Sequence, residues 1–134
     1  PRVIIDGAHN TAKMTATIKQ VKNLKRGKLH VIFGCMSSKN AKAMASQITQ
    51  VAATVRTTRF TDGYRKPTNP VELLKYFPKK LQTRAYLFPL DALAEALKVA
   101  KKSDTILVTG SLYLAGEIRA YWRPETIILK ERKS

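Results

Sequence analysis

Short apolar runs alternate along the chain with longer stretches in which apolar residues recur every three or four positions. The runs are typical of buried strands, and the longer spacing is typical of one face of an amphipathic helix. Strands are predicted at 3–5, 29–33, 53–60, 85–88, 105–108 and 127–129. Helices are predicted between them, with apolar faces that begin near Met14, Ala41, Pro70, Leu93 and Leu114.

Strands that alternate with helices form parallel βαβ units, and such a sheet is covered by helices on both faces. The sequence therefore predicts a three-layer, Rossmann-like α/β fold with a mostly parallel sheet of about six strands. A length of 134 residues is typical of one domain, so residues 1–134 are expected to form a single domain. Because the chain starts with Pro-Arg and no methionine, we expect a fragment of a longer protein.

Several details of this prediction depend on single residues. The 53–60 run contains several threonines, so this strand is expected to lie nearer an edge of the sheet. Asn69 and Asp91 are expected to cap the helices that follow them. Tyr121 and Trp122 are expected to continue the apolar stripe that begins at Leu114.

The composition limits the classes of partner. A net charge of +16 attracts anions of any kind, from small carboxylates and nucleotides to nucleic acids. The basic residues are scattered and aromatic residues make up 7%, so we do not expect a nucleic-acid partner. One cysteine and two histidines offer neither an internal disulfide nor a familiar metal-ligand spacing. No apolar run approaches the roughly 18 residues of a membrane span, and we expect a cytoplasmic protein without a membrane partner.

Polar or glycine-bearing turns follow three of the predicted strands. They are residues 6–10 (DGAHN), 34–40 (GCMSSKN) and 109–111 (TGS). In an open parallel sheet, ligands bind beyond the carboxyl ends of the strands, where helix N-termini direct N–H groups outward. The sequence therefore predicts that these three turns converge on one rim and form a wall of a ligand cleft.

Each polar residue of these turns has a structural and a functional interpretation. Asp6 should either accept hydrogen bonds from its own turn or bind ligand hydroxyls such as those of a ribose. Asn10 and Ser111 suit helix caps, although a capping hydroxyl can still face a ligand. His9 could pack on the following helix or contact a ligand. Lys39 could meet a phosphate or carboxylate, or lie on the solvated surface.

Two further residues are interpreted as structural. His30 starts a strand and lies away from the predicted rim, and Cys35 has no second cysteine or activating histidine nearby in the sequence, so both are expected to serve packing. The chain also lacks the phosphate-binding G-x-x-x-x-G-K-S/T loop and the G-x-G-x-x-G dinucleotide pattern. By itself it supplies half of a nucleotide site at most.

The first turn, Asp6-Gly7-Ala8-His9-Asn10, resembles the D-G-A-H-N motif of folylpolyglutamate synthases and dihydrofolate synthases, members of the Mur-ligase superfamily. Residues 31–40 are similar to that family's V-x-F-G-x-M-x-D-K-D segment, and residues 109–117 to its T-G-S-L-Y-L-x-G-E segment. Three motifs in the same order make the chain resemble the C-terminal domain of this family. Residues 38–40 depart from the pattern, because Ser-Lys-Asn replaces Asp-Lys-Asp.

This resemblance implies an ATP-dependent amide ligase that adds glutamate to folate or dihydropteroate through an acyl phosphate. In the family, the phosphate-binding loop and the Mg²⁺ ligands lie mainly in an N-terminal ATPase domain, which would be the partner of this chain and without which it would be inactive. No metal ligands are implied here. By carry-over, Asp6, Gly7, His9 and Asn10 would contact the nucleotide, Lys39, Gly110 and Ser111 would contact substrate, and His9 and Ser111 would have catalytic roles.

Three rival functions stay open. A peptidoglycan-precursor ligase of the same superfamily is disfavoured by the T-G-S-L-Y-L segment and by the lack of a D-N-P-R-like stretch. A stand-alone basic module would bind anions or nucleic acid through its lysines. A flavodoxin-like or receiver domain is the third, but a receiver needs an acidic cluster at its strand ends, where the sequence offers only Asp6.

Overall fold

The computed structural model describes residues 1–24, 27–37, 40–63 and 65–121. In chain order, its elements are β1 (Arg2–Ile5), α1 (Thr11–Leu24), β2 (Leu29–Phe33), α2 (Ala41–Thr49), β3 (Thr54–Thr57), α3 (Pro70–Leu73), the 3₁₀ turn η1 (Leu74–Tyr76), β4 (Gln82–Ala85), α4 (Pro89–Val99), β5 (Thr105–Thr109) and α5 (Leu112–Tyr121). The five described strands form one sheet in the order β1-β5-β2-β3-β4, and every neighbouring pair is parallel. The predicted α/β fold with a parallel sheet is confirmed.

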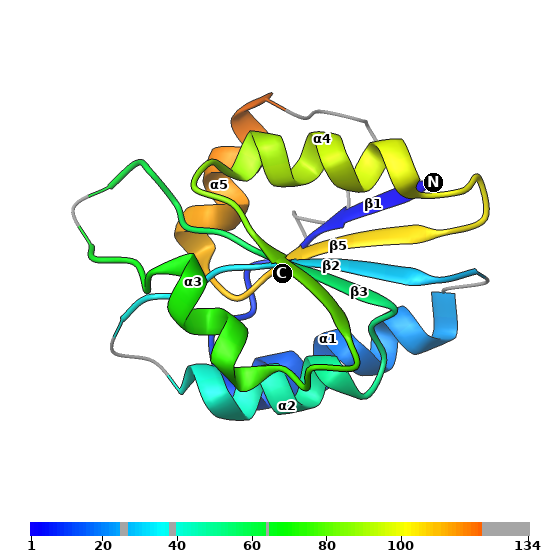
Figure 1. The fold of residues 1–134 in the computed structure, drawn as a ribbon, viewed down its shortest axis with the longest axis horizontal. Coiled ribbons are helices and arrows are strands. Elements are labelled where there is room, and N and C mark those ends of the chain that lie inside the picture. The colour runs from blue at the N-terminus through cyan, green and yellow to red at the C-terminus, as the bar shows by residue number, and fades with distance from the viewer. Residues whose placement is uncertain (25–26, 38–39, 64, 122–134) are drawn as a thin grey trace.

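Helices cover both faces of this sheet. Figure 1 shows α1 and α2 below it and α4 and α5 above it. Along β2, Leu29, Val31 and Phe33 join the core on the α1 and α2 side, whereas Ile32 joins the core on the α4 and α5 side. A strand buried on both faces reads as a continuous apolar run, which is why its bounds could be predicted correctly.

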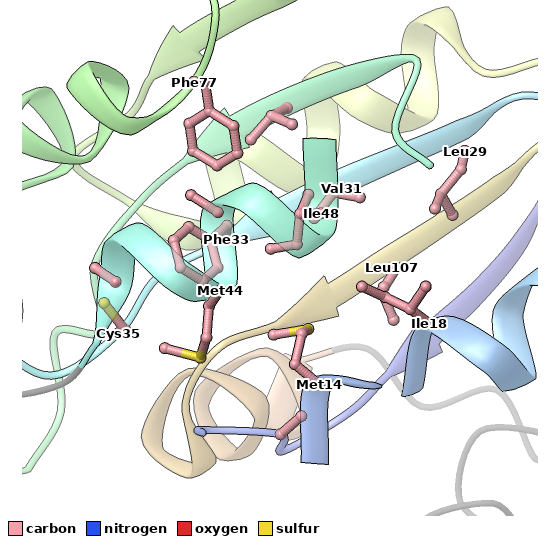
Figure 2. Close-up of a cluster of buried hydrophobic side chains, with 14 of the residues drawn as sticks. Met14, Ile18, Leu29, Val31, Phe33, Cys35, Met44, Ile48, Phe77 and Leu107 are labelled. Carbon is pink, nitrogen blue, oxygen red and sulfur yellow. The ribbon is translucent and has the colours of Figure 1, made fainter. Parts of the chain in front are cut away.

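The core on the α1 and α2 side is shown in Figure 2. Met14 and Ile18 of α1 lie over the sheet beside Met44 and Ile48 of α2, and all four side chains are buried. The apolar spacing predicted for both helices is confirmed, because the buried positions of each helix are three or four residues apart along one face.

The prediction was wrong at β4 and at the start of α4. The apolar run Ala85–Phe88 was expected to be the strand, but β4 is Gln82–Ala85. As an edge strand it is only partly covered, so its sequence lacks an apolar signal. Leu87 and Phe88 are more than half exposed, and α4 begins with Pro89 at its first position. Asp91 therefore lies in the first turn of α4 and does not cap it.

Three further predictions concern the periphery. The strand β3 lies between β2 and β4, so its threonines do not mark an edge. Asn69 caps α3 as predicted, because its Oδ1 accepts the N–H of Val71. Tyr121 is exposed and does not join the buried stripe of α5. Trp122 and the strand predicted at 127–129 lie outside the described residues.

A buried polar cluster lies at the amino ends of the central strands. His30 contacts Asp104 through Nε2, at 2.9 Å, and Thr54 through Nδ1, at 2.8 Å. Asp104 also accepts the backbone N–H groups of Lys28 and Lys101. The Lys101 N–H and the His30 ring hold the pKa of the Asp104 carboxyl well below its usual range. His30 is thus structural, as predicted.

Candidate functional site

The three polar turns converge on one rim, at the carboxyl ends of the strands. The N–H of Gly110 donates to the carbonyl oxygen of Ala8 at 2.9 Å, which joins the third turn to the first. The N–H of Gly34 donates to the carbonyl oxygen of Thr109 at 3.3 Å, which joins the second turn to the third. The predicted arrangement is confirmed by these direct backbone contacts.

The carboxylate of Asp6 stabilises this rim by accepting three hydrogen bonds. Its Oδ2 accepts the N–H of Ala8 at 2.9 Å, the hydroxyl of Thr17 at 2.8 Å and the hydroxyl of Thr109 at 3.4 Å. One carboxylate therefore ties the first turn to α1 and to the end of β5. The structural interpretation of Asp6 is confirmed, and its contact with a ligand stays a prediction.

Two candidate residues are helix caps. The Oδ1 atom of Asn10 accepts the N–H of Lys13 at 2.8 Å at the start of α1. The buried hydroxyl of Ser111 accepts the N–H groups of Tyr113 and Leu114 at 3.0 and 3.3 Å at the start of α5. Capping satisfies N–H groups that have no partner within the helix, which explains both residues locally.

One glycine of the motifs is required by close approach. Gly110 has a φ of +111°, and a Cβ there would lie 2.8 Å from the ring of Phe33 and collide with the carbonyl oxygen of Gly34. A Cβ on Gly7 would meet Cδ2 of Leu112 at 2.5 Å, but that side chain is exposed and can move aside. The identity of Gly110 therefore follows from packing, and the ligand contacts of both glycines stay predictions.

A pocket of about 380 Å³ opens at this rim. Its volume is within the range of small-ligand sites. The carbonyl oxygen of Gly7 lies 3.1 Å from Nδ1 of His9 and fixes the ring in the pocket wall. The pocket is lined by residues from the turns that follow β1, β2, β3 and β5 and by the first two residues of α5. These residues are His9, Met36, Arg65, Gly110, Ser111, Leu112 and Tyr113.

The pocket unites some predicted site residues and leaves out others. His9, Gly110 and Ser111 line it together. Asp6, Gly7 and Asn10 belong to the same turn as His9 but do not line the pocket. Lys39 lies outside the described residues.

Four lining residues were not predicted from the sequence, and Arg65 is the charged one among them. It belongs to the segment 61–69, which connects β3 to α3. The order of elements places that turn at the same rim as the other three, so its basic residue could have been found from topology alone. The other three, Met36, Leu112 and Tyr113, lie inside the motif segments but had no assigned role.

The second turn is paired with the turn that carries Arg65. The N–H of Ser37 donates to the carbonyl oxygen of Lys66 at 3.0 Å, and the N–H of Thr68 donates to that of Cys35 at 2.9 Å. Cys35 is fully buried beneath this pairing, and burial raises the pKa of its thiol. Its predicted packing role is confirmed.

The chemistry of the pocket suits an anionic group. The guanidinium of Arg65 is always charged, and the N-terminus of α5 adds the positive end of a helix dipole beside Ser111. In the described part of the chain, no three His, Cys, Asp or Glu side chains are grouped closely enough to hold a metal ion. None of the described helices has the length and hydropathy needed to cross a membrane.

The chain is similar in sequence to known ligases. The family model for the Mur ligase, glutamate ligase domain matches residues 1–112. A probable bifunctional folylpolyglutamate synthase/dihydropteroate synthase of Haloferax volcanii is 29% identical over 126 residues, which are 91% of this chain and 14% of that protein. The UDP-N-acetylmuramoyl-L-alanyl-D-glutamate–2,6-diaminopimelate ligase of Halalkalibacterium halodurans is 25% identical over 134 residues, which are 97% of this chain and 27% of that protein.

A solved structure shares the fold. The bifunctional folylpolyglutamate synthase/dihydrofolate synthase of Yersinia pestis, complexed with AMPPNP and a Mn ion, has a TM-score of 0.79 and 18% identity. The match covers 89% of this chain and 28% of that chain, so the present sequence corresponds to a minor part of each of these proteins. Since the family model spans most of the sequence and the fold agrees with it, the chain belongs to the Mur ligase, glutamate ligase domain family.

Proposed function

We propose that the chain is the C-terminal domain of an ATP-dependent acid–amino-acid ligase that adds glutamate to folate or dihydropteroate. The observation that carries this proposal is the pocket in which His9, Arg65 and Ser111 meet at the rim built by the three motifs. The relative from Haloferax volcanii supports the folate substrate, because its name includes a folylpolyglutamate synthase.

In such a reaction, ATP supplies the phosphoryl group that converts a carboxylate into an acyl phosphate, which the amine of glutamate then attacks. Catalysis of this kind depends on positioning and on neutralising negative charge. Arg65 and the positive end of the α5 dipole would attract anionic oxygens of glutamate or of the acyl phosphate. His9 would contact the same reacting groups from the turn after β1, and Asp6 of the same turn would both fix the rim and contact the nucleotide.

The nucleotide and the divalent cation need a second domain. The structure of the Yersinia pestis protein contains a nucleotide analogue and a Mn ion, and this chain covers 28% of it. The described residues offer an anion pocket but no metal-ligand group. We therefore assign most of the ATP contacts and the Mg²⁺ ligands to an N-terminal ATPase domain that would close on this rim, in a cytoplasmic enzyme.

The experiment that tests this function uses the full-length protein and measures ADP release with purified acceptors. Folate, dihydropteroate and a UDP-N-acetylmuramoyl peptide are compared, each with glutamate and with diaminopimelate. ADP release that requires glutamate together with folate or dihydropteroate supports the proposal. ADP release that requires the UDP-linked peptide would favour the peptidoglycan branch, which the relative from Halalkalibacterium halodurans represents.

A further inference from the structure

The last residue of the third motif, Glu117, has no role in the site described so far. It lies on α5 with its side chain largely buried. Its Oε1 accepts the backbone N–H groups of Thr61 and Asp62, at 2.5 and 3.1 Å, and its Oε2 accepts the hydroxyl of Thr61 at 2.5 Å. A helix side chain therefore binds the loop that follows β3, over a sequence separation of more than fifty residues.

Tyr113, one turn before Glu117 on α5, contacts the same loop after β3. Its ring packs on the ring of Phe60, with centroids 5.2 Å apart and planes inclined by 33°. Gly63, with a φ of +100°, lies so close that a Cβ there would be 3.2 Å from Cδ1 of Tyr113. Residues 60–63 are thus held against α5 by one carboxylate and one ring.

The other end of the loop is fixed to a different element. Residues 66–68 pair with residues 35–37 through the two backbone hydrogen bonds described above and an antiparallel bridge between Met36 and Pro67. Arg65 lies between these two attachments and lines the pocket. The backbone position of Arg65 consequently depends on both.

We propose that Glu117 is a positioning residue that holds Arg65 in the wall of the pocket, and that Arg65 in turn binds the carboxylate of the amino-acid substrate. The second part rests on the proposed function. The first part rests only on the contacts between Glu117 and the loop. Thr61 and Asp62 offer three donors in a row, and the carboxylate of Glu117 accepts all of them. Alanine at this position removes both acceptor oxygens, whereas glutamine keeps one oxygen for the two backbone N–H groups and can donate from its NH₂ group to the Thr61 hydroxyl.

The first experiment needs no activity. Hydrogen exchange of the peptide that spans 59–66 is measured in the full-length protein and in its Glu117→Ala variant. Exchange of the Thr61 and Asp62 amides is expected to rise about tenfold or more, because their acceptor is removed. Glu72→Ala is the matched control, since Glu72 is exposed on α3 and forms an ion pair with Lys75 of η1. Thr61→Val, which removes one of the three donors, should give a smaller increase.

The second experiment separates positioning from stability by kinetics. Glu117→Ala is expected to raise the KM for glutamate about tenfold while the KM for ATP changes less than about twofold. Arg65→Ala should have a similar or larger effect. If Glu117 acts through Arg65, the double variant should be no worse than Arg65→Ala alone, because residues that act as a unit are not additive.

Unchanged exchange at Thr61 and Asp62 would overturn the positioning role. Additive losses in the double variant, or equal increases in the KM for ATP and glutamate, would overturn the link to Arg65. A wild-type protein without glutamate ligase activity would contradict the proposed function, and hydrogen exchange would still decide whether Glu117 fixes the loop.

Discussion

The backbone N–H of Gly110 donates to the carbonyl oxygen of Ala8, 2.9 Å away, and this bond joins two motifs from opposite ends of the chain. It forms only because Gly110 has a positive φ and no side chain, which lets the turn after β5 pass close to Phe33 and Gly34. The rim of the pocket is therefore set by backbone approach, and its polar side chains are added to that frame.

Gly110→Ala is expected to destabilise the protein by about 2 kcal/mol or more, because the new Cβ is strained and meets backbone atoms. The measurement is the free energy of unfolding in urea. Gly116→Ala is the matched control within the same motif. Among the described residues, a Cβ at Gly116 would meet only the end of the Arg119 side chain, at 3.7 Å, so this variant should gain up to about 1 kcal/mol from helix propensity. Equal effects at both glycines would contradict the close approach.

Asp6→Ala should cost about 1–3 kcal/mol of stability, because Ala8, Thr17 and Thr109 lose a shared acceptor. It should also raise the KM for ATP in the full-length protein, since the resemblance places Asp6 beside the nucleotide. Asp6→Asn keeps one acceptor oxygen, so it should lose less stability and should raise the KM for ATP less. Thermal unfolding and ATP kinetics are the measurements. An unchanged midpoint would show that the three donors find other acceptors, and unchanged ATP kinetics would remove Asp6 from the nucleotide site.

Stability should fall in acid because of Asp104, at the end of the sheet opposite the pocket. Its pKa is lower in the folded chain than in the unfolded chain, so its contribution is fully present above the unfolded value of about 4 and is lost as the pH falls toward the folded value. Asp104→Asn should therefore be less stable than wild type at pH 7, and the difference should shrink below a pH of about 4. Urea unfolding across this range measures it. The exposed Asp91→Asn variant is the control, and a constant difference for Asp104→Asn would contradict the account.

The two caps allow stability and activity to be separated. Ser111→Ala and Asn10→Ala should each cost about 1 kcal/mol, since each removes an acceptor for helix N–H groups. Ser111→Ala should also lower kcat, because Ser111 lines the pocket, whereas Asn10 does not. Unfolding in urea and steady-state kinetics of the full-length variants give both values. Equal activity losses would mean that capping alone accounts for them, unless the loss at Asn10 appears as a higher KM for ATP.

The sequence predicts strongly buried elements well and weakly buried ones poorly. The central strand β2 is apolar on both faces, and its predicted bounds agree with the structure. The edge strand β4 has no such pattern. Its predicted position was wrong because Leu87 and Phe88 are apolar but exposed. The convergence of the motifs followed from parallel topology, because that topology puts all carboxyl strand ends at one edge. The contacts of Glu117 could not be predicted in this way, because they join α5 to a loop that is more than fifty residues away in the sequence.

We propose that the rim formed by the three motifs is part of the active site of a glutamate ligase. The most direct test is ATP-dependent incorporation of labelled glutamate into folate or dihydropteroate by the full-length protein, compared with its His9→Ala and Lys98→Ala variants. His9 lines the pocket, and Lys98 is exposed near the end of α4. Incorporation that is retained in Lys98→Ala and lost in His9→Ala is the predicted result. Incorporation at the wild-type rate in His9→Ala, or no incorporation by the wild-type protein, would contradict the account.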